Sequence, residues 1–190
     1  MALKTLVKVG NITNLSDARY CSGMGVEMLG FTVIEGQPDY IDPSLFQEIR
    51  GWISGPSVVA CLYGMRENGA MESIITSYAP DLLELNVDQL TLLTPASIPL
   101  IVTIHSAEDL DKLKPYHNRI RYVQVAESNK DIISQSSYPV ICEIQSGEDV
   151  PEFVDQHNVK GIALSGSPEV RPGFKDYGDL ADVLEQLEVD

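Results

Sequence analysis

The sequence predicts one α/β domain built as a (β/α)8 barrel, and three observations carry that prediction. Short apolar runs rich in β-branched residues alternate with amphipathic stretches along the whole chain. The alternation occurs eight times, which is the pattern of a closed parallel barrel, with an open doubly wound sheet as the alternative. No linker or composition shift divides the 190 residues, so we expect a single, compact barrel domain over 1–190.

The individual elements follow from these runs and from the helix start signals between them. Asn14 precedes the first amphipathic stretch, and Asp42 with Pro43 opens the second. The expected strands lie within 6–9, 28–34, 58–63, 82–85, 99–104, 122–125, 139–144 and 161–164. Later helices are expected at 67–78, 87–93, 107–114, 129–135, 148–157 and 178–188.

Composition narrows the classes of partner. The formal net charge is −15, which repels phosphate backbones and anionic membranes, so we expect no nucleic-acid and no membrane partner. No apolar run is long enough to span a bilayer, and residues 1–5 do not resemble the start of a secretion signal. Cys21, Cys61 and Cys142 cannot all pair and match no zinc spacing. These features favour a reduced, cytoplasmic protein.

Chemistry in such a barrel lies at the carboxyl ends of the strands, where this sequence places few acids or bases. His105 follows the fifth strand, and its ordinary pKa lies near neutrality. Glu84, Glu127 and Glu143 are expected near the same end, where they would raise one another's pKa. The alternatives are a hydrogen-bonded mouth histidine and carboxylates that point outward. Glu127 and His105 are the catalytic candidates, and we predict no metal and no cofactor.

Two loops of small residues follow the seventh and eighth strands. Backbone N–H groups in such loops can approach an anion closely, and barrels commonly build a phosphate site there. The alternative is that glycine and serine simply form turns. The sequence therefore predicts a phosphate or phosphosugar site, with a small phosphorylated metabolite as its ligand. Its candidate residues are Ser146, Gly147, Ser165, Gly166 and Ser167.

Two segments resemble the phosphoribosylanthranilate isomerase family. The run Lys8-Val9-Gly10-Asn11-Ile12-Thr13 is similar to the family's opening Lys-x-Cys-Gly-Ile-Thr. Residues 165–176 are similar to the family's Ser-Ser-Gly-Val-Glu-x-x-Pro-Gly-x-Lys-Asp. The resemblance implies a (β/α)8 barrel and a place among the isomerases of tryptophan biosynthesis, which convert an aldose-type phosphosugar to a ketose by an Amadori rearrangement.

The resemblance also implies losses at the reacting positions. The family's general base, a cysteine on strand one, corresponds to Gly10, and its general acid, an aspartate on strand six, falls near Gln124. Its arginine that faces the anthranilate carboxylate corresponds to Asp39, a reversal of charge. The strand-four Gln-x-His corresponds to 84–86, and the strand-eight aspartate to Ala163. One general acid or base contributes roughly 10²–10⁴ in rate, so we expect negligible isomerase activity.

Three functions stay open at this point, because barrels host many chemistries. The first is a divergent isomerase-like barrel that still binds a phosphosugar. The second is a non-catalytic binding or regulatory barrel whose protein partner the sequence does not reveal. The third is a different phosphosugar enzyme that uses new residues at the barrel mouth.

Overall fold

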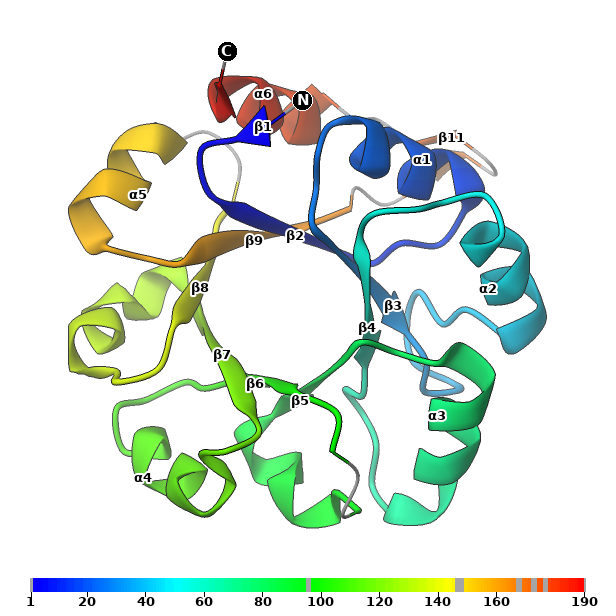
Figure 1. Ribbon diagram of the computed structural model, residues 1–190, viewed down its shortest axis with the longest axis horizontal. Coiled ribbons are helices and arrows are strands. Elements are labelled where there is room, and N and C mark those ends of the chain that lie inside the picture. Colours follow the sequence, from blue (N-terminus) through cyan, green and yellow to red (C-terminus); the bar gives the residue numbers. More distant parts are fainter. Residues whose placement is uncertain are drawn as a thin grey trace.

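The computed structural model describes residues 2–94, 97–145, 149–166, 169–171, 174–175 and 178–189. Eight parallel strands close into a barrel in chain order, and helices surround it (Figure 1). The strands β2 and β9 close the ring, with Gly10 opposite Ser165. The predicted closed barrel is therefore confirmed. The barrel strands are β2 (Leu6–Gly10), β3 (Met28–Thr32), β4 (Ser57–Cys61), β5 (Leu82–Asn86), β6 (Leu100–Thr103), β7 (Ile120–Ala126), β8 (Val140–Glu143) and β9 (Gly161–Ser165).

The outer layer begins with the helix caps that the sequence predicts. The Asn14 side chain accepts a hydrogen bond from the amide of Asp17, and Asp42 accepts from the amides of Ser44 and Leu45. Each cap satisfies backbone donors that have no partner inside the helix. The α-helices are α1 (Leu15–Gly23), α2 (Pro43–Arg50), α3 (Met71–Tyr78), α4 (Asp109–Leu113), α5 (Val150–His157) and α6 (Gly178–Gln186).

Two of the expected helices are 3₁₀ rather than α. They are η2 (Val87–Leu92) and η4 (Glu127–Gln135). In η2, the Gln89 side chain accepts from the Asn86 amide and donates to the carbonyls of Leu62 and Met65, which fixes a tight turn against the end of β4. In η4, Ser134 and Gln135 donate to the Asp131 carbonyl. Such side-chain bonds compete with the α-helical pattern, and short connectors commonly become 3₁₀.

Shorter 3₁₀ turns flank two of the α-helices. The turn η1 (Asn68–Ala70) leads into α3, and η3 (Lys114–Tyr116) follows α4, with Pro115 inside it. Proline removes a backbone donor and disfavours continuation of the α-helix. The expected helices at 67–78 and 107–114 therefore lie where the sequence predicts them, and each combines an α-helix with an adjoining 3₁₀ turn.

The two ends of the chain meet beside the barrel. The short strand β1 (Ala2–Leu3) pairs antiparallel with β12 (Glu188–Val189), as Figure 1 shows at the top of the view. A second hairpin, β10 (Glu169–Arg171) with β11 (Phe174–Lys175), follows β9. No helix in the described part of the chain is long and apolar enough to cross a membrane.

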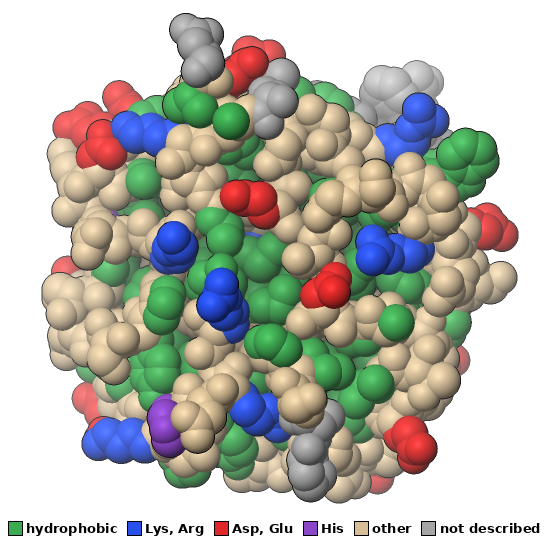
Figure 2. Space-filling view, in the orientation of Figure 1, with side chains coloured by type: hydrophobic (Ala, Val, Ile, Leu, Met, Phe, Trp, Pro, Cys, Tyr) green, Lys and Arg blue, Asp and Glu red, His purple; other side chains and the backbone are tan. Residues whose placement is uncertain are grey.

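Side chains inside the barrel separate into an apolar lower layer and a polar upper layer. The lower cluster is buried inside the barrel. Figure 2 shows the outer face at one end of the barrel, where apolar side chains lie near the middle and acidic and basic side chains lie around them. The upper layer lies toward the carboxyl ends of the strands and holds the buried polar residues Lys8, Glu84, Thr103 and Gln124. The lower cluster consists of Met28, Val59, Cys61, Leu82, Ile101, Tyr122, Ile141 and Ala163, of which Cys61 and Ala163 lie at the boundary between the two layers and also line the mouth cavity.

Candidate functional site

The upper layer centres on an ion pair inside the barrel. The Lys8 ammonium lies 2.7 Å from Glu84 Oε1 and 2.6 Å from Glu84 Oε2, and it also donates to Gln124 Oε1 at 3.0 Å. The Lys8 and Glu84 side chains are 4% and 2% exposed. Alternation along β2, β5 and β7 turns these three side chains inward. A buried charge needs such a partner, because an unpaired one would be strongly disfavoured.

Three further side chains complete this network around Glu84. The Tyr63 hydroxyl donates to Glu84 Oε1 at 2.6 Å, and it lies 2.8 Å from Thr103 Oγ1. Since a phenol has one proton, Thr103 is the donor in the second bond. The Cys61 thiol donates to Glu84 Oε2 at 3.4 Å. The Glu84 carboxylate therefore accepts hydrogen bonds from an ammonium, a phenol and a thiol at once.

The pKa values of the three proton donors around Glu84 are raised, so these groups keep their protons near neutral pH. Burial lowers the pKa of Lys8, but the Glu84 carboxylate more than offsets this, so the pKa of Lys8 lies above its usual value. Burial, together with Glu84, raises the pKa of Cys61 well above the ordinary thiol value and raises that of Tyr63 as well. Lys8 is thus a permanent ammonium near neutral pH, and Cys61 and Tyr63 keep their protons.

A cavity of about 230 Å³ opens above this network at the carboxyl ends of the strands. The Glu143 carboxylate faces it, and no described side chain donates a hydrogen bond to that carboxylate. A Cβ added at Gly10 would meet nothing closer than the Leu164 carbonyl at 3.8 Å, so the cavity has room for a side chain there. The lining comprises Lys8, Gly10, Asn11, Cys61, Tyr63, Glu84, Gln124, Glu143, Ala163, Leu164 and Ser165.

The structure brings together two of the predicted carboxylates and separates the others. Glu84 and Glu143 line the same cavity. Glu127 begins η4, is half-buried and does not line it; together with Glu143 it raises the pKa of Cys142, after burial, to about 12. His105 is exposed beyond β6, where its amide donates to Asp109 and its carbonyl accepts from Asn129.

Lys8 is the main feature that strand-end reasoning missed. It lies in the middle of the first apolar run, whereas the predicted site residues lie at or after the strand ends. A signal was present, because Lys8 and Glu84 are both charged residues inside strands that are otherwise apolar. Two opposite charges at inward positions of a closed barrel must pair. Cys61 and Thr103 also lie inside apolar runs, and nothing in the sequence pattern indicates that they and Tyr63 contact Glu84 or one another.

The predicted phosphate loops are only partly within the described residues. Ser165 ends β9, is exposed and lines the mouth cavity. The amide of Gly166 donates to the Gly10 carbonyl at 3.0 Å, and an added Cβ there would lie 3.2 Å from two carbonyl oxygens. Glycine at this position thus serves a close approach of β9 to β2. The predicted site residues Ser146, Gly147 and Ser167 lie outside the described residues.

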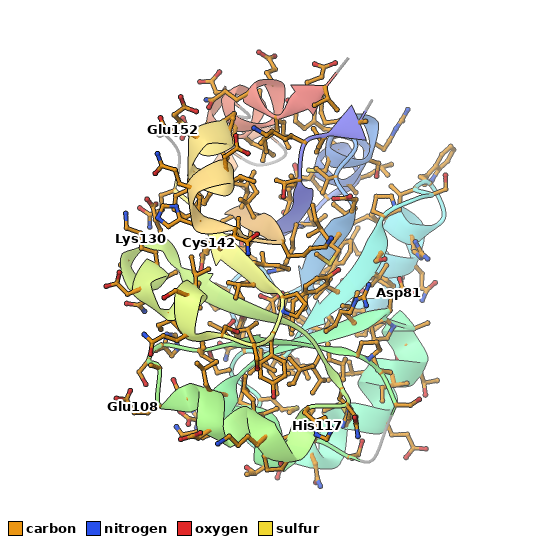
Figure 3. All side chains as sticks on the ribbon, turned by 60° about the vertical axis from the view of Figure 1, so that its left-hand side comes forward. Asp81, Glu108, His117, Lys130, Cys142 and Glu152 are labelled. Carbon is orange, nitrogen blue, oxygen red and sulfur yellow. The ribbon has the colours of Figure 1, made fainter. Side chains whose placement is uncertain are left out.

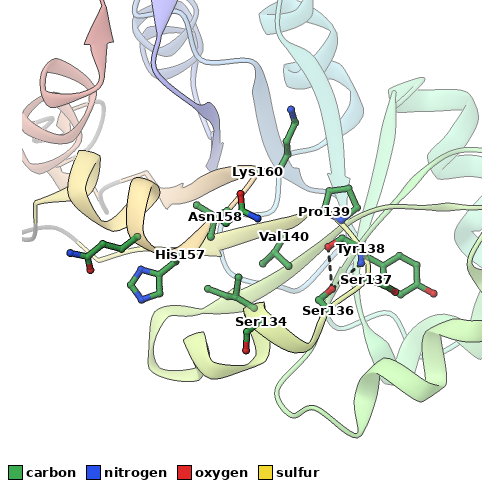
Figure 4. A pocket seen from close by; sticks show the side chains of 12 residues that line it. Ser134, Ser136, Ser137, Tyr138, Pro139, Val140, His157, Asn158 and Lys160 are labelled. Carbon is green, nitrogen blue, oxygen red and sulfur yellow. Dashed lines mark hydrogen bonds between the residues drawn. The ribbon is translucent and has the colours of Figure 1, made fainter.

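A larger hollow of about 640 Å³ lies between η4 and α5, near the amino ends of β8 and β9 (Figure 4). Its polar groups are largely committed: the Ser136 hydroxyl donates to the Tyr138 carbonyl, and Ser134 donates to the Asp131 carbonyl. The His157 ring bonds to the Phe153 carbonyl through Nδ1. Because barrel sites form at the carboxyl ends of strands, the smaller mouth cavity is the better candidate.

The outer surface beside this hollow shows no alternative metal centre. In Figure 3, Cys142 lies on β8 while Lys130 and Glu152 lie in the outer layer, on η4 and α5. Within the described ranges, no group of three or more histidine, cysteine, aspartate or glutamate residues is placed to hold a metal ion. Cys21, Cys61 and Cys142 are all buried, and no disulfide joins any two of them.

Comparison with known proteins gives one curated sequence relative and many similar structures. No family model matches the chain. It is 24% identical over 181 residues to N-(5'-phosphoribosyl)anthranilate isomerase of Agrobacterium fabrum, with 82% of each chain covered. The Thermotoga maritima phosphoribosyl anthranilate isomerase structure superposes with a TM-score of 0.76 at 16% identity, covering 96% of this chain and 98% of that one. The Pyrococcus furiosus enzyme gives 0.73 at the same identity and coverage. Sequence and fold agree with the resemblance seen in the motifs: the chain is similar in sequence to one phosphoribosylanthranilate isomerase and has the (β/α)8 fold of the solved ones.

Proposed function

We propose that this chain binds a small phosphorylated sugar in the barrel mouth and does not catalyse the family's Amadori rearrangement at a useful rate. The observation that carries the proposal is Gly10. It lines the mouth cavity at the position of the family's general base and has no side chain to accept a proton. The space for such a side chain is present, so the base is missing while the site remains open.

The position of the family's general acid supports the same proposal. The resemblance puts that acid near Gln124, and an amide cannot donate an acidic proton; its Oε1 also accepts from Lys8. The Glu84 carboxylate, which accepts from the same Lys8 ammonium as Gln124, is 1% exposed and already accepts three donors. With both roles unfilled, each worth roughly 10²–10⁴, the parent reaction loses most of its acceleration.

The phosphosugar part of the proposal draws on the mouth and on a relative. Ser165 and Asn11 line the cavity beside the loops that follow β8 and β9. A solved phosphoribosyl anthranilate isomerase with a TM-score of 0.75 to this chain is a complex with reduced 1-(o-carboxyphenylamino)-1-deoxyribulose 5-phosphate. We carry over the sugar phosphate of that ligand and not its carboxyphenyl group, since the motif resemblance puts Asp39 where the family has an arginine.

Two assays test the two halves of this proposal. Purified protein should turn over phosphoribosylanthranilate no faster than background and should not rescue a strain that lacks the isomerase. Ribose 5-phosphate should bind weakly, in the millimolar range. The double variant Gly10→Cys/Gln124→Asp returns both groups and should gain measurable turnover, whereas Gly10→Ala, of similar bulk at that position, should gain none. Robust turnover by the unchanged protein would overturn the catalytic half of the proposal.

A further inference from the structure

The described lining of the mouth cavity carries one negative charge more than it carries positive charges. Three charged side chains line it: Lys8, Glu84 and Glu143. Lys8 and Glu84 neutralise each other across 2.6 Å and are almost wholly withdrawn from solvent. The remaining charge in the described lining is the carboxylate of Glu143.

Lys8 cannot serve as a clamp for an anionic ligand group. A lysine ammonium has three N–H donors and no acceptor. The three are matched by Glu84 Oε1, Glu84 Oε2 and Gln124 Oε1, all within 3.0 Å. A ligand anion would have to displace one of these bonds inside the barrel, where such bonds are hard to replace.

Glu143 faces open space and lacks a described donor. It lies on β8 directly across from Ala163 on β9, whose side chain is a single methyl group. Gly10, which lies on the next strand round the barrel, adds no side chain at all. The cavity therefore widens in front of the carboxylate. Its lone pairs are best complemented by an ammonium group, because charge-assisted hydrogen bonds are stronger than neutral ones.

We propose that the mouth cavity selects an amino-sugar phosphate, with the ligand's ammonium on the Glu143 carboxylate and its hydroxyls toward Ser165. This inference rests on the proposed phosphosugar binding and adds the ligand's chemical class. In the described lining the charge left over is negative, so it is complemented by the ammonium of such a ligand. A ligand with a second anionic group, such as a carboxylate, is disfavoured by the same charge.

Isothermal titration with two matched probes tests the proposal. Glucosamine 6-phosphate and glucose 6-phosphate differ by one amine in place of one hydroxyl. At neutral pH the wild-type protein should bind the amino sugar about tenfold more tightly, since a pair of charges at a partly buried site is worth about that ratio. Glu143→Gln should bring the ratio near one, because the amino sugar loses the carboxylate that its ammonium contacts. Glu72→Gln, an exposed carboxylate on α3, is the matched control and should keep the wild-type ratio.

The outcomes distinguish selectivity for an amino sugar from binding of a phosphosugar as such. Equal affinity for the two probes in the wild-type protein, or an undiminished preference in Glu143→Gln, would overturn the amino-sugar assignment while phosphosugar binding stands. Failure of both probes and of ribose 5-phosphate to bind at millimolar concentration would overturn the phosphosugar proposal, and the inference with it.

Discussion

The lower and upper halves of the barrel interior are built by the same strands and from opposite chemistry. On β5, Leu82 packs in the lower cluster, while Glu84, two residues later, joins the polar network. On β8, Ile141 packs below and Glu143 faces the mouth cavity. A step of two residues keeps a side chain on the inner face and moves it up the barrel. Apolar packing in the lower half stabilises the barrel, while the polar groups of the upper half line the mouth cavity.

The upper half is itself divided between a closed and an open part. Lys8, Glu84 and Tyr63 satisfy one another, so changes there should act on stability. Glu143 has no described donor and faces the cavity, so changes there should act on binding. The following variants test this division, from the largest expected effect to the smallest.

Glu84→Gln should have the largest effect. It leaves the Lys8 ammonium buried without a counter-charge, and removing one partner of a buried ion pair costs about 3–5 kcal/mol in the free energy of unfolding. Urea denaturation measures this loss. The double variant Lys8→Met/Glu84→Leu removes both charges and should recover much of it. A loss below about 1 kcal/mol for the single variant would show that the pair does not hold the upper half together.

Alkaline pH should weaken the same network through Tyr63. Burial and Glu84 raise the folded-state pKa of Tyr63 above its ordinary value of 10.0. The contribution of Tyr63 to the free energy of unfolding is therefore complete below pH 10 and is lost as the pH rises beyond that value. Each pH unit above that value costs up to about 1.4 kcal/mol. The stability difference between wild type and Tyr63→Phe should therefore shrink from pH 8 to pH 11. A constant difference over that range would contradict the assigned hydrogen bond.

Ile141→Val probes the lower half on β8. Removing one methylene from the apolar cluster should cost about 0.5–1.5 kcal/mol, because the surrounding side chains relax only partly. Binding of ribose 5-phosphate should stay at the wild-type affinity. A change in affinity without a change in stability would mean that the two halves of the interior are not separate in function.

Glu143→Gln, two residues further along the same strand, should have the smallest effect on stability. With no described donor lost, the free energy of unfolding should change by less than about 0.5 kcal/mol. The same denaturation experiment measures it beside Ile141→Val. A loss above about 1 kcal/mol would reveal that Glu143 is bonded in the folded protein and is not available to a ligand.

The fold was predictable because each barrel strand is buried on both faces and therefore appears as an apolar run. The type of helix was not predictable in η2, since it depends on the Gln89 side chain reaching carbonyls beyond β4. At the site, Glu84 and Glu143 were expected near the mouth and do line it. His105 was placed with them, but β6 ends at Thr103 and the chain then turns toward Asp109. The direction of the residues that follow a strand depends on the position at which the strand ends. The sequence pattern does not identify the last residue of the strand.

An amide NMR titration with ribose 5-phosphate tests the central claim, ligand binding at the mouth, most directly. The account predicts millimolar, saturable shifts at the amides of Asn11, Ser165 and Gly166, with the hollow at 136–140 and 156–160 unchanged. Glu143→Gln should keep these shifts, because the phosphate is not expected to contact that carboxylate. Absence of shifts at the mouth at millimolar ligand, or shifts confined to the hollow between η4 and α5, would contradict the account.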